Sequence, residues 1–506
     1  MLQRIAATLA ALAALALGGA VCAAEVDVSV DTGVVAGQAN GAVEAFKGIP
    51  FAAPPIGPLR WKPPQPAAPW PGNRDASAYG PACPQAVDPG GRPNGGGYAG
   101  PTSEDCLSLN VFAPVHARRA PVMVWIFGGG NTAGANSIAP NDGTAFARDG
   151  VILVSVNYRL GALGFFAHPA LTRAAGAIEP LGSYGTMDQI AALKWVRRNI
   201  RAFGGDPDNV TIFGESAGGW DTLTLMSTPA ARGLFAKATV QSGGGWSAPV
   251  TLRAAEADGV SLAKTLGLPA DATADQLRAL PVQALVGAHG RFSPIVDGRL
   301  LTENATQAFA RGDQARVPLI IGSNSWEASL LPPSGYAAYL AAASAETKAA
   351  YAAEIGGDDA KLAQAMFTDG AMGAPARWIA AKQSAKSPVW LYYFSYVRVV
   401  RRGKIPGANH TSENPYVFDS QMGIPNYAGE IVADDRALAA TMHSCWVAFA
   451  KTGAPTCTGA PVWPAYTPAS DRLMEFGLTT NVREHFRKPE LDAQQNAAAM
   501  IIGDQR

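Results

Sequence analysis

The stretch VTIFGESAG, residues 210–218, decides the fold. Its first four residues are β-branched or aromatic, which predicts a buried strand, and a helical pattern runs over residues 217–226. The motif G-x-S-x-G lies between strand and helix, which is the context of a nucleophile elbow. Such a turn lifts the serine hydroxyl clear of the sheet, and the helix N-terminus supplies positive potential and a free N–H. The stretch predicts Ser216 as a nucleophile; the alternative of an ordinary Gly/Ser turn does not explain the flanking strand and helix.

Other short apolar runs resemble the strand before Ser216. Near-continuous hydrophobic strands are typical of a sheet that helices cover on both faces. Helical patterns lie between the runs, for example at residues 187–200 and 441–449. Strands that alternate with helices predict an α/β fold with a mostly parallel sheet. The predicted strands are 122–127, 151–156, 210–213, 238–241, 317–321 and 389–396.

Two further segments have a distinct composition. Residues 88–100 read DPGGRPNGGGYAG, which predicts a flexible, exposed loop. Residues 251–380 are rich in alanine with helical periodicity, so we expect an inserted helical region such as a cap.

Three glycines, Gly128, Gly129 and Gly130, follow the predicted strand 122–127 directly. Glycine lets the backbone approach a ligand closely and point N–H groups at it. Acyl transfer needs such donors for the developing oxyanion. Alone, the run would be an ordinary glycine-rich turn, but its place upstream of an elbow serine favours the catalytic interpretation.

The composition excludes several classes of protein. The 506 residues include 40 Lys and Arg and 40 Asp and Glu, so no global basic field is available to bind nucleic acid. Hydrophobic residues make up 48% and charged residues 16%, which excludes a disordered chain. The sequence has no metal-ligand cluster, phosphate loop or dinucleotide fingerprint, so we predict no cofactor and no metal.

Residues 1–24 have the features of a secretory signal peptide. Arg4 precedes an apolar run at residues 5–17, and small residues follow up to Ala24. The run is shorter than the roughly 20 residues of a membrane span, and no later stretch is apolar enough to be one. Lipidation at Cys22 is an alternative. We expect a secreted or periplasmic protein with a single domain over residues 25–506.

Four cysteines follow residue 24. An even number in an oxidising compartment favours two disulfides, although the sequence alone allows three pairings. From the even number and the local spacings we predict Cys83–Cys106 and Cys445–Cys457.

Six further motifs lie along the chain: GIPFA (48–52), EDCLSLN (104–110), VNYR (156–159), FGGDP (203–207), QSG (241–243) and PIVDG (294–298). In these motifs the sequence resembles the type-B carboxylesterases, the family that includes the cholinesterases. The resemblance covers nearly all of the chain after residue 24, and it implies an α/β-hydrolase fold with a large central sheet and an active-site gorge.

The resemblance implies roles for individual residues. Ser216 matches the nucleophile, Glu327 in GSNSWE matches the acid, and His410 in NHTSENPYVF matches the base. Other residues match positions around this triad. Gly129, Gly130 and Ala217 match the oxyanion donors, and Ser242 matches a serine near the acid. Glu413 matches the acidic position after the histidine, and Cys83–Cys106 matches a disulfide of the family.

The histidines give an independent check on the base. Only His410, His443 and His485 follow Glu327, in the order that this fold requires. His443 lies in a helical pattern and His485 in a charged run, whereas His410 lies in a loop after a predicted strand. Loops at strand ends hold catalytic groups, so we predict His410 as the base.

Some positions depart from the family pattern. Phe127 stands where many members have His or Tyr, and Asn131 where an aromatic residue is common. Residues 84–105 contain no Trp, so we expect neutral esters to be preferred over choline esters, which need a cation–π site. Trp220 and Trp246 are interpreted either as pocket residues or as core residues.

These observations predict a secreted serine hydrolase that cleaves small-molecule carboxylic esters through a Ser-His-Glu triad and an acyl-enzyme intermediate. The alternatives are a lipase, a hydrolase of amides or carbamates, and a non-catalytic recognition module of the same fold. The last is disfavoured because all three triad residues are present.

Overall fold

The computed structural model describes residues 24–420 and 431–503. The predicted signal peptide, apart from Ala24, lies outside the described residues. Strand β1 begins at Ala24.

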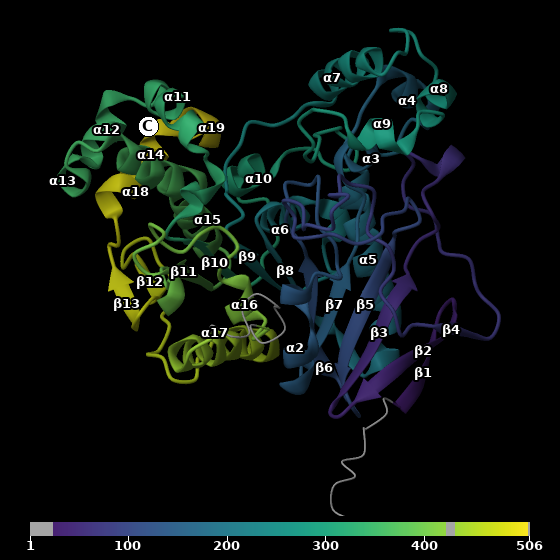
Figure 1. Ribbon diagram of the computed structural model, residues 1–506, viewed down its shortest axis with the longest axis horizontal. Coiled ribbons are helices and arrows are strands. Elements are labelled where there is room, and N and C mark those ends of the chain that lie inside the picture. Colours follow the sequence, from purple (N-terminus) through teal and green to yellow (C-terminus); the bar gives the residue numbers. More distant parts are fainter. Residues whose placement is uncertain (1–23, 421–430, 504–506) are drawn as a thin grey trace, which may run out of the picture.

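One large sheet runs through the molecule (Figure 1), in the order β1-β2-β3-β5-β7-β6-β8-β9-β10-β11-β12-β13, with β4 paired to β2. Neighbouring strands from β7 to β12 are parallel, and the pairings outside them in that order are antiparallel. The strands are β1 (Ala24–Val30), β2 (Gly33–Asn40), β3 (Val43–Pro50), β4 (Asn73–Asp75), β5 (Ser108–Pro114), β6 (Ala120–Ile126), β7 (Ile152–Val156), β8 (Gly205–Glu215), β9 (Lys237–Gln241), β10 (Leu319–Asn324), β11 (Val389–Phe394), β12 (Arg472–Phe476) and β13 (Thr480–Glu484).

The helices lie in the connections between these strands, except for the last two, which follow β13. They are α2 (Thr144–Arg148), α3 (Gly161–Gly164), α4 (Pro169–Ala174), α5 (Tyr184–Asn199), α6 (Ala217–Ser227), α7 (Leu252–Thr265), α8 (Ala274–Arg278), α9 (Val282–Val286), α10 (Ala305–Arg311), α11 (Tyr336–Ala342), α12 (Ala345–Ala350), α13 (Ala352–Ile355), α14 (Asp359–Thr368), α15 (Ala374–Ser384), α16 (Asn414–Val417), α17 (Ala433–Thr452), α18 (Lys488–Ala497) and α19 (Ala499–Ile502). None of the described helices is both long and apolar enough to cross a membrane.

The predicted strands form the parallel centre of the sheet. The six apolar runs correspond to β6, β7, β8, β9, β10 and β11, which confirms the α/β prediction. Every residue of β7, β9 and β10 is buried, because helices cover both faces of the sheet there.

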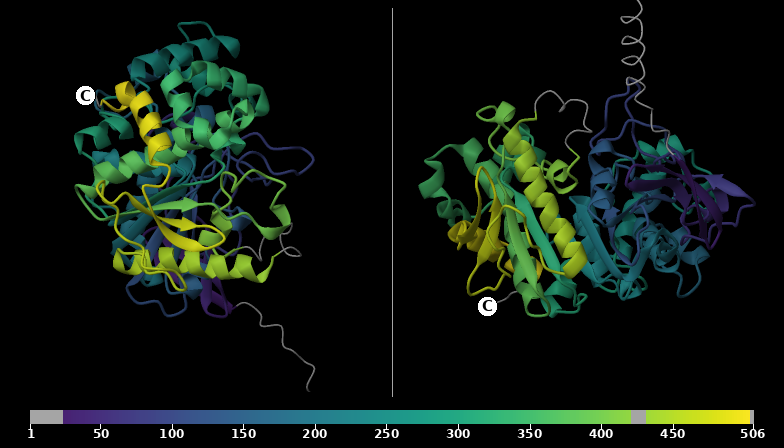
Figure 2. Two further views of the ribbon diagram at one scale, coloured as in Figure 1. Left: turned by 90° about the vertical axis from the view of Figure 1, so that its left-hand side faces the viewer. Right: turned by 90° about the horizontal axis from the view of Figure 1, so that it is seen from below.

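Alternate residues of the central strands face different helices. Trp125 in β6 and Phe213 in β8 are direct neighbours with ring centroids 4.7 Å apart. Phe146 of α2 packs against Phe213 on one side and against His443 of α17 on the other, so α2 and α17 cover this face. Helices α5 and α6, which contact each other and β8, cover the other face. Figure 2 shows α17 running along the sheet beside β10 and β11.

The alanine-rich segment 251–380 forms helices on both sides of the predicted strand 317–321, which is β10 in the centre of the sheet. Helices α8 and α9 contact α4 and α3, whereas α12 contacts α18 near the C-terminus, so the helices form two separate groups (Figure 1). Alanine-rich periodicity shows where helices form but does not show which surface they cover.

Both predicted cysteine pairs are joined. Cys83 and Cys106 have an S–S distance of 2.00 Å, and Cys445 and Cys457 one of 2.06 Å. The segment 88–100, predicted to be exposed, is only partly so. Tyr98 within it is buried and donates to the carbonyl of Pro101, and the side chain of Asn94 holds the turn by accepting from Gly96 N–H and Tyr98 N–H.

Candidate active site

The turn between β8 and α6 holds Ser216 in an unusual backbone conformation. Its φ and ψ are +58° and −126°, a region that non-glycine residues rarely occupy. The turn is tight because glycines flank it: a Cβ on Gly218 would lie 2.0 Å from the carbonyl oxygen of Ile126, and one on Gly214 would lie 2.3 Å from that of Gly218. Because neither glycine has a Cβ, the backbone can form this tight turn, which holds Ser216 in its strained conformation at the end of β8.

Glu327 and His410, which are far apart in the sequence, meet at the carboxyl ends of the strands. Glu327 follows β10, and His410 lies in the loop before α16. His410 Nδ1 is 2.6 Å from Glu327 Oε2. The other carboxylate oxygen, Oε1, accepts from Asn324 N–H at 2.7 Å and from the Ser242 hydroxyl at 2.5 Å. These contacts fix the carboxylate, which in turn orients the imidazole.

The second ring nitrogen of His410 faces the nucleophile turn. Nε2 is 3.1 Å from Glu215 Oε1, but the two atoms are not aligned for a hydrogen bond, and both lack a hydrogen-bond partner among the described residues. Among the described residues, no hydrogen bond joins Ser216 to His410. The ring thus meets the turn at Glu215, the residue directly before Ser216.

Three buried carboxyl groups surround His410. Burial alone would lower the pKa of His410, but the charges of Glu215 and Glu327 outweigh it and raise the pKa to about 10. Burial raises the pKa of Glu215 to about 8; the nearby His410 works against this rise, and the carboxylates of Glu413 and Glu327 add to it. The cluster favours a proton on the imidazole between two carboxylates.

Glu413 is completely buried beside the Glu327–His410 pair. Asn324 Nδ2 donates to one of its oxygens, and Gln241 Nε2 lies 3.4 Å from the other. Burial, followed by the negative charge of Glu327, raises the pKa of Glu413. Asn324 contacts both Glu413 and Glu327. Glu413 is therefore linked to the Glu327–His410 pair through Asn324, and its hydrogen bonds to the described residues do not include one to His410.

The glycine-rich loop after β6 approaches the nucleophile turn closely. A Cβ on Gly128 would lie 2.6 Å from the carbonyl oxygen of Glu215 and 2.9 Å from Ser216 Cβ, so only glycine allows this approach. The N–H groups of Gly129, Gly130 and Ala217 make no hydrogen bond to the described residues. Three backbone donors are thus available beside Ser216.

A buried network holds the far end of this loop. Asn131, with φ at +57°, donates to Asp221 of α6 at 3.2 Å and accepts from the Tyr158 hydroxyl at 3.3 Å. The same hydroxyl lies 2.7 Å from the carbonyl oxygen of Phe127, whose ring stacks on Tyr158. Asp221 also accepts from Gln189 at 2.6 Å, and burial raises its pKa to about 7 despite these two amides. The two residues that depart from the family pattern, Phe127 and Asn131, are therefore both tied to Tyr158.

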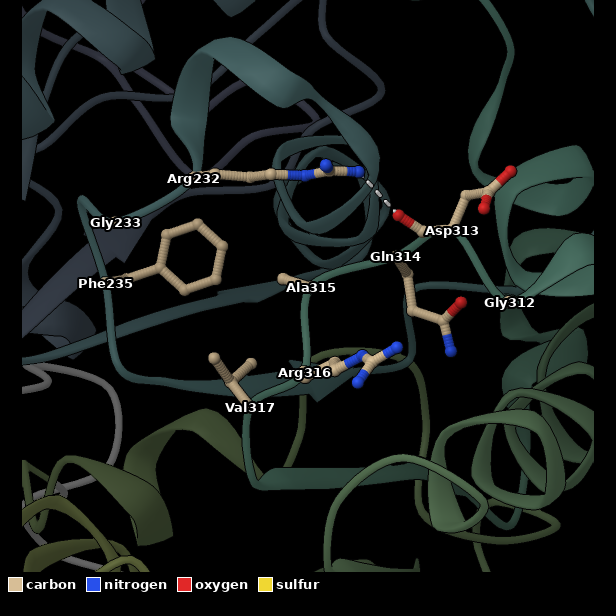
Figure 3. A pocket seen from close by; sticks show the side chains of 9 residues that line it. All are labelled: Arg232, Gly233, Phe235, Gly312, Asp313, Gln314, Ala315, Arg316 and Val317. Carbon is tan, nitrogen blue, oxygen red and sulfur yellow. Dashed lines mark hydrogen bonds between the residues drawn. The ribbon is translucent and has the colours of Figure 1, made fainter.

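A pocket of about 360 Å³ opens beside Glu215 and the glycine-rich loop. Its walls come from the loop at residues 94–97, from Gly128 and Gly129, and from the residues on either side of His410. A larger cavity of about 410 Å³ lies elsewhere, where the chain enters β9 and β10. Figure 3 shows that Arg232 reaches across this second cavity to the carbonyl of Asp313. Because it lies at the amino ends of the strands, it is remote from the Glu327–His410 pair.

The two tryptophans that the sequence left open differ in surroundings. Trp246 packs against Trp378 with ring centroids 6.3 Å apart, and Trp220 is half-buried against the core. Neither of them lines the pocket beside Glu215. In the part of the chain that the structure describes, no group of three or more His, Cys, Asp and Glu could hold a metal ion.

Sequence reasoning did not assign several residues of this site. Asn324 could have been found, because it is the asparagine of the motif that contains Glu327. Asn141, which lines the pocket beside Glu215, and Asp221, which accepts from Asn131, belong to no motif, and only the tertiary structure brings them to the site.

Comparisons with known proteins find similar proteins over most of the chain. A model of the carboxylesterase family matches residues 24–355 and 340–494. The chain is similar to the para-nitrobenzyl esterase of Bacillus subtilis (strain 168), with 37% identity over 475 residues that cover 87% of this chain and 92% of the relative. It is also similar to the fumonisin B1 esterase of Sphingopyxis macrogoltabida, with 35% identity over 464 residues, 87% of this chain and 84% of the relative.

Solved structures give the same result. A PNB esterase superposes with a TM-score of 0.80 and 34% identity, covering 92% of this chain and 99% of that chain. A carboxylesterase of Geobacillus stearothermophilus superposes with a TM-score of 0.81 and 31% identity, covering 93% and 100%.

Proposed function

The chain belongs to the carboxylesterase family and is a carboxylic-ester hydrolase of the α/β-hydrolase fold, and from this premise we propose that Ser216, His410 and Glu327 form its catalytic triad. Ser216 attacks the carbonyl carbon of the ester, and His410 takes the serine proton through Nε2. Glu327 holds the tautomer of the imidazole through Nδ1 and stabilises the imidazolium that forms.

The breakdown of the tetrahedral intermediate follows from the same residues. Protonated His410 gives its proton to the leaving alcohol, and the acyl group stays on Ser216. Water then repeats the sequence of steps on the acyl-enzyme and releases the acid. The N–H groups of Gly129, Gly130 and Ala217 receive the oxyanion in both halves of the reaction, and the loss of one such donor typically costs about 3–4 kcal/mol of barrier.

The observation that carries this proposal is the contact of 2.6 Å between His410 Nδ1 and Glu327 Oε2, with the opposite ring nitrogen facing the nucleophile turn. A histidine held by a carboxylate on one side, with its other ring nitrogen beside the residue that precedes an elbow serine, is placed to serve as a general base. Ser242 and Asn324 support this role, because they fix the second oxygen of Glu327.

Covalent labelling tests the proposal. We expect diethyl p-nitrophenyl phosphate to modify Ser216 once per chain and to abolish hydrolysis of p-nitrophenyl butyrate. Ser216→Ala should fold, because the serine lies at a turn rather than in the core, and should lose both the activity and the label. Labelling at another serine, or an active Ser216→Ala enzyme, would contradict the assignment.

A panel of substrates separates ester hydrolysis from the alternatives. We expect p-nitrophenyl esters of short and medium chain length to be cleaved faster than the corresponding anilide or a long-chain emulsified ester. An anilide rate equal to that of the ester would identify an amidase, and activation by an oil–water interface would identify a lipase.

We further propose that residues 1–24 are removed as a signal peptide and that the protein acts outside the cytoplasm. The two disulfides support this location, because they persist in oxidising compartments. N-terminal sequencing of the exported protein tests the cleavage site.

A further inference from the structure

The pocket beside Glu215 has a more polar lining than is usual for a site that binds simple alkyl esters. Its volume is about 360 Å³, and side chains with amide, hydroxyl or carboxyl groups make up much of its wall. Hydrophobic and aromatic side chains usually predominate in small-molecule pockets. The polar members are Asn94, Asn141, Glu215, Asn409, Thr411, Ser412 and Asn414.

Several of these polar groups make no hydrogen bond within the part of the chain that the structure describes. Asn141 is only 7% exposed, yet its side-chain amide makes no hydrogen bond to the described residues. Glu215 Oε1 and the indole N–H of Trp125, which also lines the pocket, are buried without a hydrogen-bond partner. Other wall residues differ, since the amide of Asn94 is used within its own turn. Buried polar groups are nearly always paired, so unpaired ones around a cavity indicate a polar occupant.

The position of the pocket shows which part of the substrate it receives. Asn409 and Thr411, the neighbours of His410, lie in its wall together with Gly128 and Gly129. His410 is the group that hands its proton to the leaving alcohol, so the alcohol part of the ester lies on the histidine side of the scissile bond. The pocket is therefore placed for the alcohol rather than for the acyl chain.

The lining favours a neutral hydroxylated group over a cation or an alkyl chain. The amide of Asn141 can both donate to and accept from a hydroxyl group. The carboxylate of Glu215, whose Oε1 makes no hydrogen bond among the described residues, can accept from a hydroxyl group. The aromatic residues in the wall, Trp125 and Phe127, are almost completely buried, which leaves little ring face for a quaternary ammonium group.

We propose that this pocket binds the alcohol part of the ester and selects alcohols that carry further hydroxyl groups, with Asn141 as the specificity-determining residue. The proposal rests on the proposed function. A hydroxylated alcohol satisfies Asn141 and Glu215 in the complex, whereas an alkyl alcohol displaces water from them and leaves them unpaired.

The test compares three butyrate esters that differ only in the alcohol: 2,3-dihydroxypropyl, propyl and choline. We expect wild-type kcat/KM for the dihydroxypropyl ester to exceed that for the propyl ester by about tenfold or more. Asn141→Leu, which keeps a similar volume, should reduce this ratio to about one. Gln65→Leu makes the same change of an amide to an alkyl group in a separate groove and should keep the wild-type ratio.

Two results would overturn the proposal. The first is a wild-type ratio of one or less, or a ratio that survives in Asn141→Leu. The second is a choline ester favoured over the dihydroxypropyl ester at high salt, which would identify a cation site instead. The wild-type ratio needs no variant, so a misfolded Asn141→Leu enzyme does not prevent the test. Failure of the proposed function would look different, because then even propyl butyrate would not be cleaved through Ser216.

Discussion

Two buried clusters of charge in this molecule use the same kinds of group in opposite ways. In one, Asp188 of α5 faces Arg159, and both are almost completely buried. In the other, Glu215, Glu327 and Glu413 surround a single histidine, His410. The first cluster balances one anion with one cation, whereas the second places three carboxyl groups around one base.

The hydrogen bonds show the same difference. Asp188 Oδ2 accepts from the backbone N–H and Nε of Arg159, and Oδ1 accepts from Nη2. Arg159 Nη1 donates to the carbonyl of Lys62. Around His410, in contrast, Nε2 and Glu215 Oε1 have no hydrogen-bond partner among the described residues. A fully paired cluster stabilises the fold, while unpaired atoms at a pocket are available for chemistry.

The largest expected effect concerns the carboxylate that holds the base. Glu327→Gln should lower kcat by about 10⁴-fold, because an amide at this position no longer favours the tautomer in which His410 Nδ1 donates to residue 327. Hydrolysis of p-nitrophenyl butyrate measures the effect. Glu179→Gln, at the half-buried Lys62–Glu179 pair, is the matched control and should keep the wild-type rate. A Glu327→Gln enzyme within tenfold of wild type would remove the distinction between the two clusters.

The next effect is one of stability. Asp188→Ala leaves the Arg159 guanidinium buried without its carboxylate, so the free energy of unfolding should fall by about 3–5 kcal/mol. Urea denaturation followed by circular dichroism measures this loss. Asp208→Ala removes one partner of an exposed pair with Arg197 and should cost less than about 1 kcal/mol. Equal losses in the two variants would show that Asp188–Arg159 is not a special stabilising element.

The third effect is a change in pH dependence. Glu215→Gln removes a carboxylate that raises the pKa of His410, so the pKa of the imidazole should fall. Because only the neutral imidazole acts as a base, the acidic limb of kcat/KM should move to lower pH by about one unit or more. A pH profile from pH 4 to 10 tests this sign. An unchanged limb, or one at higher pH, would mean that Glu215 does not act on the base.

The smallest effect concerns a third kind of buried carboxyl group. Asp221 accepts from two amides, those of Asn131 and Gln189, and no salt bridge of the described residues includes it. Burial raises its pKa from 3.8 to about 7, so the folded protein keeps a proton that the unfolded chain releases near pH 4. The stability that wild type owes to this group therefore falls as the pH rises from about 4 to 7.

Asp221→Asn has no such proton to lose. Its new amide can donate to Gln189 Oε1, which in the wild type makes no hydrogen bond to the described residues. We compare the free energy of unfolding of the variant with that of wild type at each pH. The difference, variant minus wild type, should be about 1–3 kcal/mol larger at pH 8 than at pH 4, because the variant is then relatively more stable. Denaturation at the two pH values measures this difference, and the opposite sign would show that Asp221 is ionised and stabilising in the folded state.

Much of the fold could be predicted from the sequence because its signals are local. The strand, turn and helix at residues 210–218 fixed the elbow, since the tight approach of Gly214 and Gly218 admits no side chain there. The runs that became β6 to β11 were apolar throughout, as burial on both faces requires. The placement of helices could not be predicted where it depends on packing, as for the alanine-rich helices that divide into two groups around β10.

The sequence by itself determined which residues are available for chemistry and predicted their roles: an elbow serine, an acid in GSNSWE, a loop histidine after a strand, and four cysteines in local pairs. Tertiary structure alone decided that Glu215 faces His410, that Asp221 accepts from Asn131, and that Asn141 lies in the pocket wall. The physical reason is distance along the chain. A motif encodes contacts within a few residues. The crossover connections between parallel strands bring together side chains that are tens to hundreds of residues apart, and no local pattern shows which of them meet.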